Sequence, residues 1–206
     1  ARALHGLGHF DEAERKFLES RAMRESLGDR SGVAGNDCYR GYVAIDQGDL
    51  DRAEALFMAS IKEHTETGEP THAANAWAGL GKVLNLRQDW SGASKVLANA
   101  LEFQKTGFDR RLPSFVLTEA AVVLSALGQA DRAAWALAAA EKMRRESRLR
   151  LSVPDQGRFD GAVAEVRRQL SVERCEQQSE AALLASDRDA VATVQAWLSE
   201  HSNASG

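Results

Sequence analysis

The chain repeats itself every forty residues, and this period constrains the fold more than any local propensity does. In each copy a Gly or Gln is followed three residues later by Asp or Ser, and two residues after that by Ala. The four copies lie at residues 7–13, 47–53, 87–93 and 127–133. A large apolar residue comes four positions after each Ala, and a small one three positions later. The large positions are Phe17, Phe57, Leu97 and Leu137, and the small ones are Ser20, Ser60, Ala100 and Ala140.

Each repeated residue of this pattern has a structural role in a helical hairpin. The Gly or Gln ends the first helix, because glycine adopts the left-handed conformation at low cost. The Asp or Ser is expected to be the N-cap of the second helix. The small residues let paired helices approach closely, and a third small position recurs at Gly41, Gly81 and Ala121. One hairpin cannot bury such a face alone, so the hairpins must stack. The expected N-caps are Asp11, Asp51, Ser91 and Asp131.

The expected architecture is therefore all-α, with a repeat array over residues 1–150 and helices that cap it over 151–206. We expect array helices at about 2–7, 11–27, 33–47, 51–67, 72–87, 91–106, 113–127 and 131–148, joined by turn-rich segments at 28–32, 68–70 and 107–109. Beyond Pro154 the frame stops, and amphipathic helices are expected at 155–170, 172–184 and 187–198. The first repeat lacks most of its first helix and no Met begins the chain, so we expect a fragment of a longer protein.

Composition excludes several classes of partner. The net charge of −4 provides no electrostatic reason to bind nucleic acid directly or an anionic membrane. No apolar run approaches the roughly 18 residues that span a bilayer. The two cysteines, Cys38 and Cys175, are too few for a disulfide framework, which predicts a reducing, cytoplasmic setting.

The sequence carries no recognisable catalytic, cofactor or metal motif, so we expect a binding domain rather than an enzyme. The five histidines form no His-x-x-x-His pair and are expected at the surface. The segment Gly79-Leu80-Gly81-Lys82 superficially resembles a phosphate loop, but the Walker spacing is absent and Val83 stands where Ser or Thr is needed. Its glycines are expected to serve helix packing.

The third repeat resembles the tetratricopeptide family. That family has Trp, Leu, Gly and Tyr on the first helix and Ala, Phe and Ala on the second. The matching residues here are Trp77, Leu80, Gly81, Ala93, Leu97 and Ala100, with Leu84 at the Tyr position. The resemblance covers about residues 1–150 and implies a right-handed α-solenoid, although each unit is six residues longer than the basic repeat.

In tetratricopeptide arrays the first helix of each hairpin lines a concave groove that binds a partner. Carried onto this register, the resemblance implies that the groove residues are Tyr42, Asn75, Lys82, Asn85, Thr118 and Ser125. Lys82 and Asn85 are three residues apart and share a helix face, as in family members that clamp a carboxylate. The alternative is that these polar side chains only solvate a concave wall.

A dense run of positive charge lies at residues 142–150. Two interpretations are open: a solvated helix end whose cations complement the helix dipole, or a docking patch for an acidic partner or domain. The candidate patch residues are Arg144, Arg145, Arg148 and Arg150.

The later repeats and the segment after Pro154 resemble the C-terminal helical region of the STAND family, the MalT, AfsR and LuxR type of bacterial signalling ATPases and transcription regulators. The residues that carry this resemblance are 126–134, 138–144, 154–159 and 162–163. It implies a cytoplasmic bacterial regulator whose helical region senses a protein, a peptide or a small inducer and controls attached ATPase or DNA-binding domains. The alternatives are a passive scaffold without ligand-driven switching and an accessory domain of a kinase or cyclase.

Overall fold

The computed structural model describes residues 1–102 and 110–202, and within these ranges the chain forms eleven helices and no strand. The helices are α1 (Arg2–Gly6), α2 (Phe10–Ser26), α3 (Arg30–Asp46), α4 (Leu50–Glu66), α5 (Pro70–Leu86), α6 (Trp90–Glu102), α7 (Arg111–Ala126), α8 (Ala130–Glu146), α9 (Val153–Gln169), α10 (Val172–Leu184) and α11 (Asp187–Ser202). The linker expected at 107–109, and the helix end expected at 106, lie outside the described residues.

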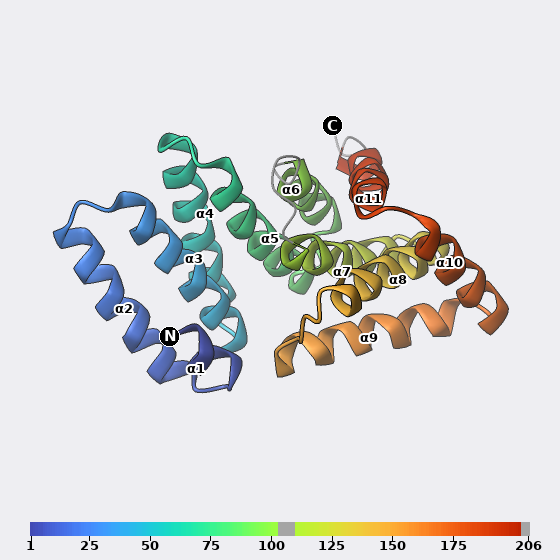
Figure 1. Ribbon diagram of the computed structural model, residues 1–206, viewed down its shortest axis with the longest axis horizontal. Coiled ribbons are helices and arrows are strands. Elements are labelled where there is room, and N and C mark those ends of the chain that lie inside the picture. Colours follow the sequence, from blue (N-terminus) through green and yellow to red (C-terminus); the bar gives the residue numbers. More distant parts are fainter. Residues whose placement is uncertain (103–109, 203–206) are drawn as a thin grey trace.

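The helices form a repeat-like array in which neighbours in sequence are neighbours in space. Each helix from α1 to α8 packs against the next, and α3, α5, α7 and α9 also contact one another in succession. Figure 1 shows the array running from α1 and α2 at one end to α8 and α10 at the other. The even-numbered helices α2, α4, α6 and α8 begin at Phe10, Leu50, Trp90 and Ala130, which occupy the same position of the sequence repeat.

The helix stops lie where the sequence predicts them. Gly8, Gly48 and Gly128 have φ of 81°, 81° and 75°, the left-handed region that glycine enters at low cost. In the third repeat Gln88 takes the same conformation with φ of 61°, although it carries a side chain. The α5–α6 turn therefore holds backbone strain that the equivalent turns lack.

The predicted N-caps are wrong by two residues. The α4 N-cap is Asp49, whose carboxylate accepts from the Arg52 N–H at 3.1 Å. Asp89 likewise accepts from the Gly92 N–H at 2.9 Å. The helices begin before the positions that the Ala spacing suggested, so the predicted residues lie inside the first turn. In the first turn, the aspartates among them still complement the positive end of the helix dipole. The residues concerned are Asp11, Asp51, Ser91 and Asp131.

The repeated alanine of each copy is buried between helices, as the repeat pattern predicts. The recurrent alanines Ala13, Ala53, Ala93 and Ala133 are all 0% exposed. The large residues that follow are buried as well, at Phe17, Phe57, Leu97 and Leu137. Glycines make the closest approaches possible: a Cβ on Gly41 would lie 2.8 Å from the Phe57 ring, and one on Gly79 would overlap that ring.

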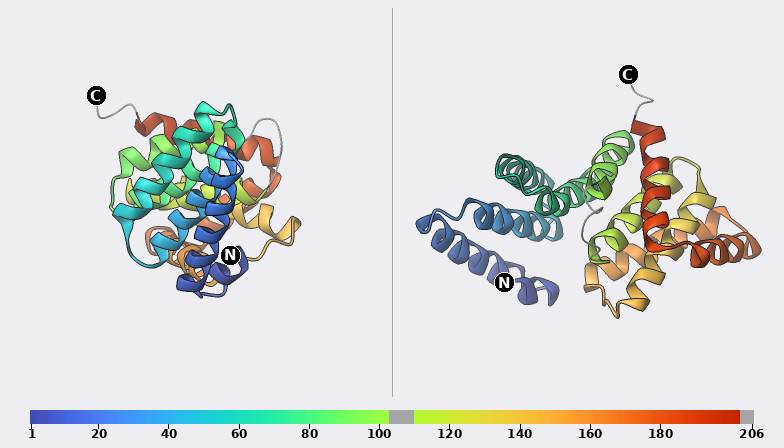
Figure 2. Two further views of the ribbon diagram at one scale, coloured as in Figure 1. Left: turned by 90° about the vertical axis from the view of Figure 1, so that its left-hand side faces the viewer. Right: turned by 45° about the horizontal axis from the view of Figure 1, so that its top comes forward.

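The C-terminal tail, helices α9 to α11, wraps back over the array. Helix α9 packs on α7 and α8, α10 packs on α8, and α11 reaches α6. Figures 1 and 2 show α11 beside α6, and Figure 1 shows α9 running beneath α7 and α8. One hydrophobic cluster joins Ala74 and Leu97 to Phe159 and Leu198, so the tail shares its core with the later repeats.

Candidate functional site

A cavity of about 980 Å³ lies between the early repeats and the start of α9. Helices α1, α3 and α5 form one wall, and α7 with the α8–α9 connection forms the other. Two of the six predicted groove residues, Tyr42 and Asn75, line it. The other four lie farther along the array, where α9 or buried polar contacts engage them. The concave side therefore divides into an open part and an occupied part.

Aromatic rings form much of the open cavity. The Tyr42 ring packs edge-on against Phe57 and Phe115, at centroid distances of 5.1 and 6.0 Å. Its hydroxyl donates to the Asn75 carbonyl oxygen at 2.9 Å, which joins α3 to α5. The amide side chain of Asn75 itself is exposed on the cavity wall. Tyr42 thus supplies rigid apolar surface, and Asn75 supplies hydrogen-bonding groups.

Positive charge is concentrated at the same cavity. Of the described residues that line it, three are arginines, Arg2, Arg111 and Arg150, and one is acidic, Asp155. The Arg2 guanidinium lies over the ring of Tyr39, 4.9 Å from its centroid, which orients a cation toward the space. This surplus of cations, on a chain of net charge −4, favours an anionic ligand.

Lys82, the proposed carboxylate-binding residue, holds a carboxylate of its own chain. Its Nζ lies 3.1 Å from Asp155 Oδ1, and only 5% of the residue is exposed. Asp155 is fixed in turn by Ser152, the N-cap of α9, whose hydroxyl donates to Asp155 Oδ2 at 2.7 Å. The N-terminus of α9 is therefore pinned to α5 at the edge of the open cavity.

Asn85 belongs to a buried polar cluster that joins α5, α7 and α9. Its Nδ2 donates to Glu119 Oε2 at 2.8 Å. Arg158 of α9 pairs with both oxygens of Glu119 at 2.5 Å, and Glu119 is 1% exposed. Burial works against the charge on Arg158, but the paired carboxylate outweighs it and raises the pKa of Arg158. Charge-assisted bidentate pairs are among the stronger polar interactions in proteins, so this pair is a strong link between α9 and the repeats.

Thr118 and Ser125 are also engaged within the chain. The Ser125 hydroxyl accepts from Gln169 Nε2, at the far end of α9, at 2.9 Å. Thr118 lies 3.4 Å from Nη1 of Arg144. Helix α9 thus runs along the positions that the family resemblance assigns to the groove, from Lys82 to Ser125.

The four arginines of the candidate docking patch do not share one surface. Arg144 is 6% exposed and lies 4.0 Å from the centroid of the Phe159 ring, beneath α9. Burial lowers its pKa. Arg145 is exposed and pairs with Glu141 at 2.5 Å, as expected of a solvated helix end. Arg148 is exposed just beyond α8, and Arg150 faces the open cavity.

Two histidines converge on one carboxylate at the α4–α5 turn. Nδ1 of His64 and Nδ1 of His72 lie 3.3 and 3.0 Å from Glu69 Oε2, which also accepts from the Ser31 hydroxyl. Hydrogen bonds from Ser31, His72 and His64 lower the pKa of Glu69 to about 2. Burial lowers the pKa of His64, and the bond to Glu69 offsets only part of this.

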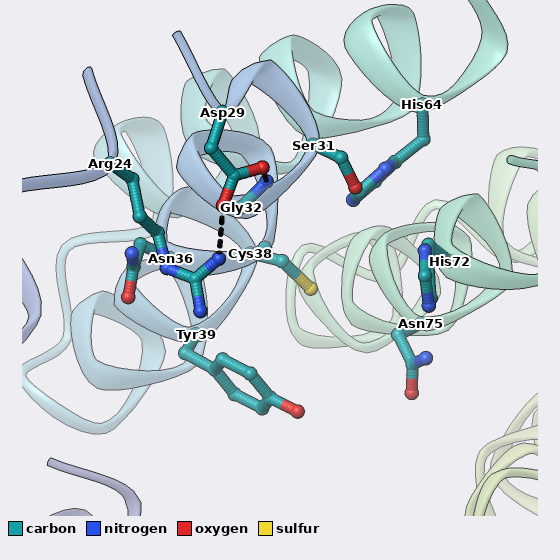
Figure 3. Close-up of a pocket in the computed structure, with 11 residues that line it drawn as sticks. Arg24, Asp29, Ser31, Gly32, Asn36, Cys38, Tyr39, His64, His72 and Asn75 are labelled. Carbon is teal, nitrogen blue, oxygen red and sulfur yellow. Dashed lines mark hydrogen bonds and ion pairs between the residues drawn. The ribbon is translucent and has the colours of Figure 1, made fainter. Parts of the chain in front are cut away.

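The expectation that all histidines lie at the surface is wrong for His64. The residue is 2% exposed, because it lies on the face of α4 that packs against α5. Figure 3 shows the side chains of His64 and His72 approaching each other across a small cavity into which Cys38 also points.

Sequence reasoning missed Glu119 and Arg158, although a signal was present. Glu119 is the only charged residue between Pro113 and Ala126, in an otherwise apolar helix. In the forty-residue frame it stands where the third repeat has Gly79. A carboxylate buried in an apolar helix needs a partner of opposite charge. The amphipathic segment after Pro154 contains basic residues that can supply this partner.

No helix among the described residues combines the length and apolar character needed to cross a bilayer. No protein-family model matches the chain, and no curated protein or solved structure matches it either.

Proposed function

We propose that this chain is a ligand-binding domain of a larger bacterial cytoplasmic regulator, built as a right-handed tetratricopeptide-like solenoid and without catalysis of its own. The common start of α2, α4, α6 and α8 in the forty-residue frame supports the solenoid. The observation that carries the function is the open cavity of about 980 Å³ with its aromatic and cationic lining. A cavity of this size accommodates a small inducer or several residues of a peptide.

The ligand class follows from the lining. Carboxylates and phosphates pair well with arginine, and apolar groups pack on the rings of Tyr39, Tyr42 and Phe115. The proposed ligand is therefore an anion with an apolar part, such as a peptide with a free C-terminal carboxylate or a small organic acid.

Ligand binding would be coupled to α9 through Lys82. Asp155 lines the cavity and also holds Lys82, so it occupies the place of an incoming carboxylate. A ligand that replaces Asp155 would release the N-terminus of α9 and shift the domain toward a second conformation. Attached ATPase or DNA-binding domains would respond to that shift.

A matched pair of charge reversals tests the binding site. Arg150 and Arg145 are both exposed, but only Arg150 lines the cavity. We expect Arg150→Glu to weaken binding of short peptides with free C-terminal carboxylates, or of small organic acids, by about tenfold or more. Arg145→Glu should leave the affinity unchanged, and Asn75→Ala should weaken it. Isothermal titration against both ligand sets measures this, and equal affinities for wild type, Arg150→Glu and Asn75→Ala would reject the site.

A passive scaffold is the second candidate, and the buried Glu119–Arg158 pair favours it. Glu119 is 1% exposed and pairs with Arg158 through both carboxylate oxygens. Such a pair would hold α9 in one position and so fix the curvature of the array. Hydrogen exchange separates the two functions: a sensor exposes the first turn of α9 when ligand binds, whereas a scaffold shows no change there.

A further inference from the structure

The α4–α5 turn brings together three side chains that are suited to binding a transition metal. Among the described residues, His64, Glu69 and His72 place one ligand atom each within 4.8 Å of one another. The two histidines lie eight residues apart in sequence, in the last turns of α4 and the first turn of α5. The helical hairpin places them side by side, with ring centroids 5.3 Å apart.

The distances suit a tetrahedral site. Bonds of about 2.0–2.1 Å from a metal to its ligands place neighbouring ligand atoms roughly 3.3 Å apart. Both imidazoles direct Nδ1 at the same carboxylate oxygen, at 3.3 Å for His64 and 3.0 Å for His72. All three ligand atoms lie within 4.8 Å of one another, and rotation of the exposed His72 ring can close the set around an ion.

The turn also offers the access that an exchangeable metal needs. His64 and His72 both line a cavity of about 290 Å³ next to the site, so one coordination position can face water. The surroundings hold the buried ligand in place: His64 is 2% exposed, and Ser31 donates to Glu69. A ligand fixed by a neighbour is typical of metal sites, because it reduces the ordering that binding requires.

We propose that His64, Glu69 and His72 form a site for a divalent transition metal, with two imidazole nitrogens, one carboxylate oxygen and water in the fourth position. Imidazole and carboxylate together favour Zn²⁺, Co²⁺, Ni²⁺ or Cu²⁺ over Mg²⁺ or Ca²⁺. The ion would tie α4 to α5 at the turn between the second and third repeats. The competing interpretation is a hydrogen-bonded cluster in which Glu69 accepts from both imidazoles and no metal binds.

Titration with Zn²⁺ and Co²⁺ separates these interpretations, using protein that carries no histidine tag. We expect one Zn²⁺ per chain by calorimetry and the intense visible absorption of four-coordinate Co²⁺. No binding, or only the weak absorption of octahedral Co²⁺, would overturn the proposal.

Single variants identify the ligands. His72 has a side chain that is 63% exposed, so His72→Ala removes a ligand without opening the core, and it should weaken Zn²⁺ binding by at least about tenfold. His64→Ala should do the same, with circular dichroism as the check on folding. His5→Ala changes a histidine at another position and serves as the control. Unchanged Zn²⁺ affinity in His72→Ala would overturn the proposal.

A further variant tests the composition of the ligand set. Cys38 points into the same cavity, and burial raises the pKa of its thiol to about 12. The proposed set does not include Cys38. Cys38→Ser should therefore retain the Zn²⁺ affinity and the Co²⁺ spectrum, and loss of either would overturn the proposed ligands.

Discussion

The concave side is open in the early repeats and filled by α9 in the later ones, although the same repeat builds both. The two parts differ at one equivalent position of the repeat. The third repeat has Gly79, against which the Phe57 ring packs, and the fourth has Glu119, which pairs with Arg158 of α9. At this position the fourth repeat holds a buried charge that requires a partner, whereas the third repeat holds a glycine that lets an aromatic ring pack closely.

Removing the arginine of this pair is expected to have the largest effect. In Arg158→Ala the Glu119 carboxylate stays buried with Asn85 as its remaining side-chain partner, which should cost about 3–5 kcal/mol in the free energy of unfolding. Chemical denaturation followed by circular dichroism measures the loss. The control is Arg145→Ala, since the exposed pair with Glu141 should contribute only about 0.3–0.5 kcal/mol. If the two variants lost similar free energies of unfolding, the buried Glu119–Arg158 pair would not distinguish the later repeats from the early ones.

Filling the space at the equivalent glycine tests the other region. A Cβ in Gly79→Ala would overlap the Phe57 ring and should destabilise the early repeats by about 1–3 kcal/mol. Gly35→Ala is the matched control, because nothing lies within 4 Å of its added Cβ. That helical substitution should stabilise the chain by about 0.5–1 kcal/mol. If Gly79→Ala and Gly35→Ala had the same melting temperature in thermal melts, close packing of the Phe57 ring on Gly79 would not be what stabilises the early repeats.

Relief of the backbone strain in the α5–α6 turn, which lies between the two regions, should stabilise the chain. Gln88 adopts φ of 61°, so Gln88→Gly should stabilise the chain by about 0.5–1 kcal/mol in the same melts. Gly48→Ala, at φ of 81°, should destabilise it by a similar amount or more. A loss of stability in Gln88→Gly would show that the Gln88 side chain stabilises the chain by more than the relief of backbone strain does.

A small acid effect should be confined to the early repeats. Burial lowers the pKa of His64, so below about pH 6.5 the unfolded chain binds this proton more readily than the folded chain does. Stability should therefore fall as the pH drops from 7 to 5, and His64→Gln should reduce that dependence. Thermal melts across this pH range provide the measurement. An unchanged pH dependence in His64→Gln would assign the effect to other groups.

Most of the helical array could be predicted from the sequence, because its signals are local. The buried alanines at 13, 53, 93 and 133 follow from a spacing that only stacked hairpins satisfy. The helix stops follow from the conformational freedom of glycine. The N-caps were missed because a polar residue at either of two nearby positions can cap, and side-chain geometry decides between them.

The occupied groove could not be predicted in the same way. An amphipathic helix at 155–170 shows that one face is buried, but it does not show which surface covers that face. The Glu119–Arg158 pair joins α7 to α9 through residues that are 39 positions apart in sequence. The cluster at His64 was missed because its histidines are eight residues apart and converge only through the α4–α5 turn.

Hydrogen exchange of α9 in the full chain tests the central claim most directly. The amides of α9 from Gln156 to Gln169 should be protected in the wild type, because Lys82, Glu119 and Ser125 hold the helix in the groove. Arg158→Ala should lose this protection selectively, with α2 and α3 unchanged. Rapid exchange of α9 in the wild type, or unchanged protection in Arg158→Ala, would contradict the account.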